Sequence, residues 1–175
     1  RHYFPNAKIV ADRFHVIRLV GHHFLKAWQL LDPEGRKNRG LLSLMRRHEE
    51  KLDPSQRQKL IRYLDSIPTL RIIWEFKQGL CKLLLVKRQK KQECKKLIPI
   101  YLNYVQELKE SPLESLKTLG NTLDSWSQEI VRMWRFTKSN GITEGFHNKM
   151  EVISRRAYGF RNFENYRLRV RALCS

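Results

Sequence analysis

The sequence is short of acidic side chains and cysteines, and it has no long apolar run. Its 175 residues include 17 Asp and Glu against 35 Lys and Arg, so the formal net charge is +18. No apolar run approaches the roughly 20 residues that a membrane-spanning helix needs, so we expect a soluble protein. The three cysteines form no Cys-x-x-Cys pair, which argues against a zinc ribbon or a disulfide framework and is typical of reduced, cytosolic cysteines.

The excess of positive charge predicts a polyanionic partner. Nucleic acid is the first candidate, and an anionic membrane surface or a ribosome are the alternatives. Association with such a partner should weaken steeply as salt rises. Hydrophobic residues make up 41% and charged residues 30% of the chain, a balance that supports a folded core. The length fits one domain, or one domain that carries an insertion.

The hydrophobic period changes within the first thirty residues. Residues 7–12 are a short, mostly apolar run that ends in an acid, which predicts a buried strand whose last residue emerges at a sheet edge. From Phe14 to Leu31 apolar residues recur every three or four positions, as one face of a helix requires. A lone strand cannot form a sheet, and the chain begins at Arg1 without a leader. We therefore interpret the start as an internal cut, with partner strands upstream.

Helical patterns fill the middle of the sequence. After a basic loop expected at residues 36–40, Asp53 and Pro54 predict the start of a helix that runs to about residue 66. A longer helix is expected from Pro68. The tetrapeptide Ser-Pro-Leu-Glu at residues 111–114 matches a full capping box, which predicts a helix starting at its proline.

The side chains of this helical region divide into expected core and expected surface. Another helical pattern runs from about residue 123 to residue 134. The tryptophans of the middle are predicted to lie in the core: Trp74, Trp126 and Trp134. The histidines His22, His23 and His48 have no metal-ligand spacing and are predicted at the surface.

The last forty residues predict two further helices. Ser139 or Asn140 is expected to cap a helix that ends at Gly159, a residue suited to the left-handed conformation of a helix C-terminus. Asn162 is expected to cap the final helix. The expected outline is therefore one strand, an all-helical middle and two helices.

Two acids occupy positions suited to metal-dependent phosphoryl chemistry. Asp12 ends the predicted strand, and Glu144 lies in the first turn of a predicted helix. Rigid elements hold such carboxylates at a fixed separation, and oxygen-preferring Mg²⁺ takes one or two of them per ion. Each acid also has a structural interpretation, because a strand-end Asp often forms a turn and a first-turn Glu favours the helix dipole.

Two long blocks of sequence resemble one family. Residues 3–16 read YFPNAKIVADRFHV, and residues 139–150 read SNGITEGFHNKM, a match that continues through RRAYGFRNF at residues 155–163. Both blocks resemble bacterial insertion-sequence transposases with an Asp-Asp-Glu catalytic core, most closely the ISL-three group. The helical middle resembles that group only in character.

The resemblance implies an α/β RNase H-like catalytic core, incomplete here, with a large all-α insertion, so that the fragment itself is mostly α. Residues 1–32 would carry the strand with the second catalytic Asp and then a helix. Residues 33–135 would form the helical insertion domain, and residues 136–175 would supply the C-terminal core helices with the catalytic Glu. Asp12 and Glu144 would be the catalytic and metal-binding pair, and the family's first Asp would lie before Arg1.

The activity implied is metal-dependent DNA strand cleavage and strand transfer, with Mg²⁺ or Mn²⁺ as cofactor. The implied partners are double-stranded DNA, as transposon ends and target, and further copies of the protein on that DNA, in the bacterial cytoplasm and at the nucleoid. The chain alone is expected to be inactive because one ligand is missing. The alternative is an inactive, basic, helical DNA-binding remnant of a transposase.

The neighbouring polar residues give a candidate DNA-binding set. His15, three residues after Asp12, is a candidate for contact with metal-bound water or a phosphate. The residues expected to contact DNA lie in two groups: Asn148, Lys149, Arg155 and Arg156 near Glu144, and Lys87, Arg88, Lys90 and Lys91 in the helical middle. A solvated basic face is the alternative interpretation for both groups.

Overall fold

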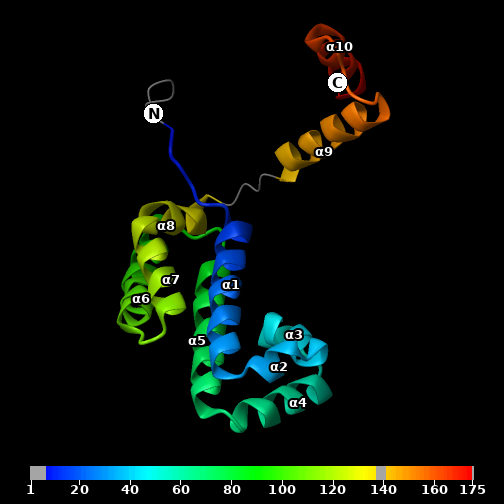
Figure 1. Ribbon diagram of the computed structural model, residues 1–175. Coiled ribbons are helices and arrows are strands. Elements are labelled where there is room, and N and C mark those ends of the chain that lie inside the picture. The colour runs from blue at the N-terminus through cyan, green and yellow to red at the C-terminus, as the bar shows by residue number, and fades with distance from the viewer. Residues whose placement is uncertain (1–6, 137–140, 175) are drawn as a thin grey trace. The chain divides into compact units, whose positions relative to one another are not determined.

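The computed structural model describes residues 7–136 and 141–174, and every regular element in these two stretches is helical (Figure 1). The side chains of the second stretch are described from residue 145 to residue 173. The chain divides into two compact units, which we call unit 1 (Arg1–Thr137) and unit 2 (Lys138–Ser175) and treat separately. None of the described helices has the length and apolar character to cross a membrane.

The described part of unit 1 is a succession of short and medium helices. They are α1 (Arg13–Leu31), α2 (Pro33–Lys37), α3 (Arg39–Arg46), the 3₁₀ helix η1 (Glu49–Lys51), α4 (Pro54–Asp65), α5 (Pro68–Leu85), α6 (Lys91–Glu110), α7 (Glu114–Ser125) and α8 (Ser127–Arg135). Unit 2 contains α9 (Gly141–Arg156) and α10 (Phe163–Cys174). The expectation of a mostly α fragment is confirmed for the described residues.

Two helices, α1 and α5, connect two hydrophobic cores in unit 1. The larger core holds Val20 of α1 and Leu84 of α5, packed among buried residues of α6, α7 and α8. The second core is centred on Trp28 of α1 and Trp74 of α5 and is closed by α3 and α4. Because both helices run through both cores, the two ends of unit 1 are mechanically joined.

Several helix boundaries follow the local sequence signals. Asp53 caps α4 as expected, and the structure adds a reciprocal capping box with Gln56. The Asp32 carboxylate accepts the Gly35 N–H at 2.9 Å, which caps α2 directly after α1 ends. The basic loop expected at residues 36–40 is wrong in detail, because Asn38 accepts the N–H groups of the following residues and starts α3 there.

The capping box predicted at residues 111–114 is also wrong. The preceding helix α6 continues to Glu110 and α7 begins only at Glu114, without a side-chain cap. The Ser111 hydroxyl instead accepts the N–H of Leu113 at 3.2 Å. Leu113 packs against the larger core, so tertiary burial moves the helix start beyond the position that the local motif favours.

The core assignments hold for two of the three tryptophans. Trp74 and Trp134 are buried, whereas Trp126 is exposed at the break between α7 and α8. His23 was expected at the surface and is buried on the inner face of α1, where burial lowers the pKa of its imidazole. Its Nδ1 atom has no partner among the described residues.

Unit 2 is a pair of helices joined by a tight turn. Tyr158 and Gly159 both adopt positive φ, at 51° and 91°, so the chain leaves α9 through the left-handed region near the predicted glycine. The Asn162 carboxamide accepts the Glu164 N–H at 2.8 Å and caps α10, as expected. Phe160 packs beside Tyr166 with ring centres 5.2 Å apart, which holds the turn against α10.

Candidate functional site

Asp12 is the N-cap of α1. Its backbone is extended (φ −77°, ψ 119°), and its Oδ1 atom accepts the N–H groups of Phe14 at 2.8 Å and His15 at 3.3 Å. Such a cap offsets the partial positive charge of the helix N-terminus. Both of these hydrogen bonds use Oδ1, so Oδ2 has no part in capping. The side chain is half-buried.

The segment before Asp12 has no regular secondary structure, so the strand predicted at residues 7–12 is wrong for this structure. It runs along α8: the Ala11 N–H donates to the Glu129 carbonyl at 3.1 Å, and Arg132 Nη1 donates to the Ile9 carbonyl at 3.2 Å. A strand needs a neighbouring strand for its ladder of hydrogen bonds, and among the described residues a helix occupies that place.

Arg13 fixes the position of Asp12. From the first turn of α1 its guanidinium donates to three carbonyls: Leu84 at 3.1 Å, Val86 at 3.0 Å and Met133 at 2.6 Å. These carbonyls lie at the C-terminal ends of α5 and α8, where backbone acceptors lack partners within their own helix. Burial lowers the pKa of Arg13, and the adjacent Asp12 carboxylate partly offsets this effect.

The position of Arg13 in the sequence carries one signal that this side chain has a structural partner. A cation in the first turn of a helix is unfavourable next to the positive end of the helix dipole. Its placement there indicates an interaction that outweighs the dipole, and the three carbonyls provide it.

An exposed, basic turn joins α5 to α6: Lys87, Arg88 and Lys90 lie between the two helices, and Lys91 is the first residue of α6. We call these four residues the basic turn. None of the four takes part in an ion pair within the described residues. The turn is nevertheless ordered by backbone contacts: Gln89 donates its N–H to the Trp134 carbonyl at 3.0 Å and its side-chain amide to the Lys87 carbonyl at 2.9 Å. Arg88 has a φ of 56°, a left-handed conformation that the tight turn imposes.

Glu144 falls within the first turn of α9, in unit 2, and its side chain lies outside the described residues. Asn148 and Lys149 follow one turn later and are exposed. Further along the same helix Arg155 and Arg156 are also exposed, and Arg155 binds Glu151 at 2.8 Å. The candidate residues of unit 2 thus share one helix, while Asp12 and the basic turn belong to unit 1.

His15 is exposed in the first turn of α1. Its ring packs edge-on against the Phe14 ring with centres 5.5 Å apart, and its backbone N–H helps to bind Asp12. The structure thus places the imidazole one turn from the Asp12 carboxylate, on the solvent side.

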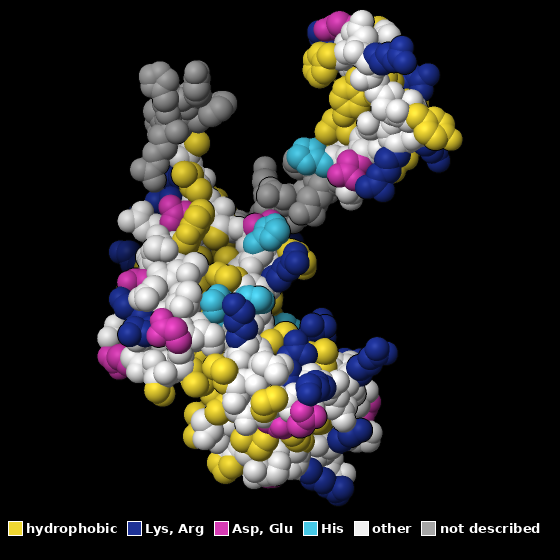
Figure 2. All heavy atoms as spheres, in the orientation of Figure 1, with side chains coloured by type: hydrophobic (Ala, Val, Ile, Leu, Met, Phe, Trp, Pro, Cys, Tyr) yellow, Lys and Arg dark blue, Asp and Glu magenta, His cyan; other side chains and the backbone are white. Residues whose placement is uncertain are grey.

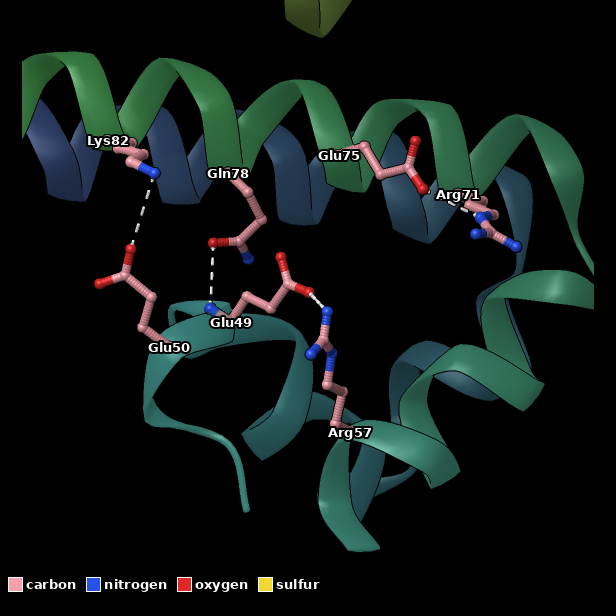
Figure 3. A network of polar contacts seen from close by, with 7 residues as sticks. All are labelled: Glu49, Glu50, Arg57, Arg71, Glu75, Gln78 and Lys82. Carbon is pink, nitrogen blue, oxygen red and sulfur yellow. Dashed lines mark hydrogen bonds and ion pairs between the residues drawn. The ribbon is translucent and has the colours of Figure 1, made fainter. Parts of the chain in front are cut away.

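A second group of acids lies in a cleft of about 650 Å³ between η1 and α5. Figure 3 shows these acids with their partners: Glu49, Glu50, Arg57, Arg71, Glu75, Gln78 and Lys82. Each glutamate in it has a cationic partner, with the closest approach from Arg57 and the longest, 4.0 Å, from Lys82. No group of three metal-ligating side chains occurs within the described part of the chain. The ion pairs of Glu49 with Arg57 and of Glu50 with Lys82 connect η1 to α4 and α5.

Comparison with known proteins gives one family. The sequence profile of a transposase family, the ISL-three group, matches residues 1–170. The transposase for insertion sequence element IS1001 of Bordetella parapertussis is 27% identical over 96% of this chain, which spans 42% of that protein's length. A Lactococcus lactis protein described as an ATP-dependent protease is 35% identical over 33% of this chain and 18% of its own length. No solved structure matches.

The profile covers nearly the whole chain, including both Asp12 and Glu144. The short match to the protease covers too little of either protein to compete with it. The chain therefore belongs to the ISL-three family of insertion-sequence transposases.

Proposed function

We propose that this chain is part of a transposase that cleaves DNA strands and transfers them, and that Asp12 and Glu144 are two of its catalytic carboxylates. The observation that carries the proposal is the fixed position of Asp12. It stands at the start of α1, held by Arg13 and by α8, within a family-matched block of sequence. A rigidly placed carboxylate is what metal-dependent phosphoryl transfer requires.

The chemistry of Asp12 fits a hard divalent cation such as Mg²⁺ or Mn²⁺. A carboxylate oxygen is the preferred donor for these ions, and Oδ2 of Asp12 is not used by the helix cap. Two such cations, when bound, activate the attacking oxygen and stabilise the leaving oxygen of an in-line displacement at phosphorus. Asp12, Glu144 and a first Asp upstream of Arg1 would hold them.

We further propose an RNase H-like core for the protein as a whole. In this arrangement residues 1–32 and 136–175 belong to the core and residues 33–135 form a helical insertion domain. The proposal requires residues 7–12, which form no helix, to pair with a strand from the rest of the protein in place of their contacts with α8. The described elements from α2 to α8 are all helical, which supports a helical insertion, and α1 joins it to the core by packing into both of its hydrophobic clusters.

Double-stranded DNA, as transposon ends and as target, is the partner that we propose, with several copies of the protein assembled on it. The net charge of +18 supports this assignment. The basic turn in unit 1 and the exposed side chains Asn148, Lys149, Arg155 and Arg156 in unit 2 would bind the sugar-phosphate backbone. His15 would contact a phosphate or a metal-bound water beside Asp12.

The test is a strand-transfer assay on transposon-end DNA with Mg²⁺. It needs a protein that extends this chain upstream to the length of its relative. Strand transfer should require the metal and should disappear in Asp12→Ala and in Glu144→Ala. Retention of strand transfer in either variant would overturn the assignment of that residue.

The second candidate is a DNA-binding remnant without activity. The net positive charge supports the remnant as well as the active transposase, because both candidates predict DNA binding that weakens steeply with salt. The strand-transfer assay separates them: a remnant binds the DNA but joins no strands with any metal. Residues 1–175 alone should also join no strands, and activity of this fragment would contradict a ligand upstream of Arg1.

A further inference from the structure

The basic turn lies next to the start of α1, although the bond that joins the two, from Arg13 to Val86, spans 73 positions in sequence. Arg13 Nη2 donates to the carbonyl of Val86, the residue directly before Lys87. Arg13 itself directly follows Asp12. The candidate catalytic carboxylate and the basic turn are thus joined through one side chain and one backbone carbonyl.

The end of α8 completes this junction. Gln89, in the middle of the basic turn, donates its backbone N–H to the carbonyl of Trp134, and Arg13 donates to the carbonyl of the preceding Met133. The indole Nε1 of Trp134 in turn donates to the Leu83 carbonyl at 3.0 Å, near the end of α5. Figure 1 shows the start of α1 beside α8 at one end of unit 1.

The charge at this end of unit 1 is strongly positive. Besides the basic turn, Lys8 and Arg135 lie over the Phe136 ring, at 5.5 Å and 5.3 Å from its centre. The acid nearest in sequence to the turn, Glu93, is bound by Lys96 at 2.9 Å. The four cations of the basic turn have no such partner among the described side chains and are free to bind an external anion.

An isolated carboxylate repels the phosphates of DNA, so a catalytic Asp needs positive charge close by to bring a strand to it. We infer that the basic turn is this element: it binds the DNA backbone where the strand passes Asp12. The insertion thereby contributes directly to the catalytic site. This inference rests on the proposed function and assigns its substrate a path over unit 1.

Matched control variants exist because unit 1 carries exposed cations elsewhere. Figure 2 shows Lys and Arg side chains over α2 to α4 as well, away from the start of α1. Four exposed residues there, without ion pairs within the described part, match the basic turn in number and charge: Arg39, Lys51, Lys59 and Arg62. The basic-turn variant changes its four cations to Ala, and the control variant changes the other four. Both variants lose the same charge, one beside the start of α1 and the other over α2 to α4.

The experiment measures whether bound DNA passes close to Asp12 and whether this depends on the basic turn. A single thiol is placed at the exposed position 14 by Phe14→Cys, with Cys174→Ser, while Cys81 and Cys94 stay buried. An iron–EDTA chelate on this thiol cuts nearby DNA when ascorbate and peroxide are added. The probe is an end-labelled, mixed-sequence duplex saturated with protein, so that cutting reports proximity rather than affinity.

Cutting from position 14 should fall several-fold in the basic-turn variant and stay unchanged in the control variant. The basic-turn variant should also flatten the dependence of log affinity on log salt by about 2 to 4, since each phosphate contact contributes about 0.9. Equal cutting in both variants, or no cutting by the parent protein, would overturn the inference. Denaturation midpoints of both variants check that the fold is intact.

The cutting assay is independent of strand transfer. It uses the iron of the chelate and asks nothing of the metal site. Loss of strand transfer in every form, with cutting still dependent on the basic turn, would overturn the proposed function alone. Strand transfer that requires Asp12, with cutting independent of the basic turn, would overturn only the DNA path.

Discussion

The guanidinium of Arg13 lies 2.6 Å from the carbonyl oxygen of Met133, across 120 residues of sequence. This bond ties the first turn of α1 to the last turn of α8, and two further bonds from the same side chain tie both to the end of α5. The position of Asp12 therefore depends on a side chain that has no direct part in the proposed chemistry.

Arg13→Gln should lower the free energy of unfolding of unit 1 by about 2–4 kcal/mol, because it leaves several half-buried carbonyls without a donor. Chemical denaturation of the chain, followed by helical circular dichroism, measures the change. Arg18→Gln is the control: Arg18 is exposed on the same helix, and its replacement should have little effect. Equal stability of the two variants would show that the carbonyl contacts contribute nothing.

Tyr63→Phe should destabilise the second core by about 1–3 kcal/mol. The Tyr63 hydroxyl accepts the Trp28 Nε1–H at 2.7 Å and donates to Asp32 Oδ2 at 2.6 Å. Its removal leaves the indole N–H of the fully buried Trp28 without a partner. Tyr104→Phe is the control, since that hydroxyl has no hydrogen-bond partner among the described residues, and denaturation midpoints compare the two.

The same hydroxyl should make unit 1 sensitive to alkali. Burial, and then the bond to Asp32, raise the pKa of Tyr63 to about 12 from its ordinary 10. Between these values the folded protein keeps a proton that the unfolded chain releases, so the free energy of unfolding falls as pH rises through this window. Below pH 10 the contribution is complete. Denaturation at pH 9 to 12 should show this fall in the parent and a shallower one in Tyr63→Phe.

Gly120→Ala should separate α7 from α6. A Cβ atom there would lie 2.8 Å from the backbone nitrogen of Lys109 and 2.9 Å from Cβ of Leu108. Backbone cannot move aside cheaply, so we expect a loss of about 1–3 kcal/mol. Gly21→Ala, where no atom lies within 4 Å of the added Cβ, should instead gain about 0.5–1 kcal/mol from helix propensity. Thermal melts of the two variants should move in opposite directions.

Local signals predicted the helices well where a cap or a proline acts on its immediate neighbours. The caps at Asp53 and Asn162 are examples. The predictions failed where distant contacts decide. Leu113 packs on the core and shifts the start of α7, and Trp126 breaks a run of apolar residues that otherwise has continuous helical spacing.

The candidate site shows the same division. The family-like blocks pointed to Asp12, and the structure gives it a fixed place as a helix cap. No local pattern indicated that Arg13 would reach Val86 and Met133, because such contacts depend on how α1, α5 and α8 pack. Residues 7–12 were predicted as a strand from their own pattern. A strand forms only where a second segment pairs with it, and the local pattern does not reveal that second segment.

We propose that the charge of Asp12 serves catalysis in addition to capping α1. Asp12→Asn tests it most directly, because Asn caps a helix about as well as Asp but lacks the negative charge that a divalent cation requires. In the upstream-extended protein, Asp12→Asn should keep its free energy of unfolding to within about 0.5 kcal/mol, whereas Asp12→Ala should lose about 1 kcal/mol. Metal-dependent strand transfer should be abolished in both. Strand transfer that survives in Asp12→Asn would contradict the account and leave Asp12 with a structural role alone.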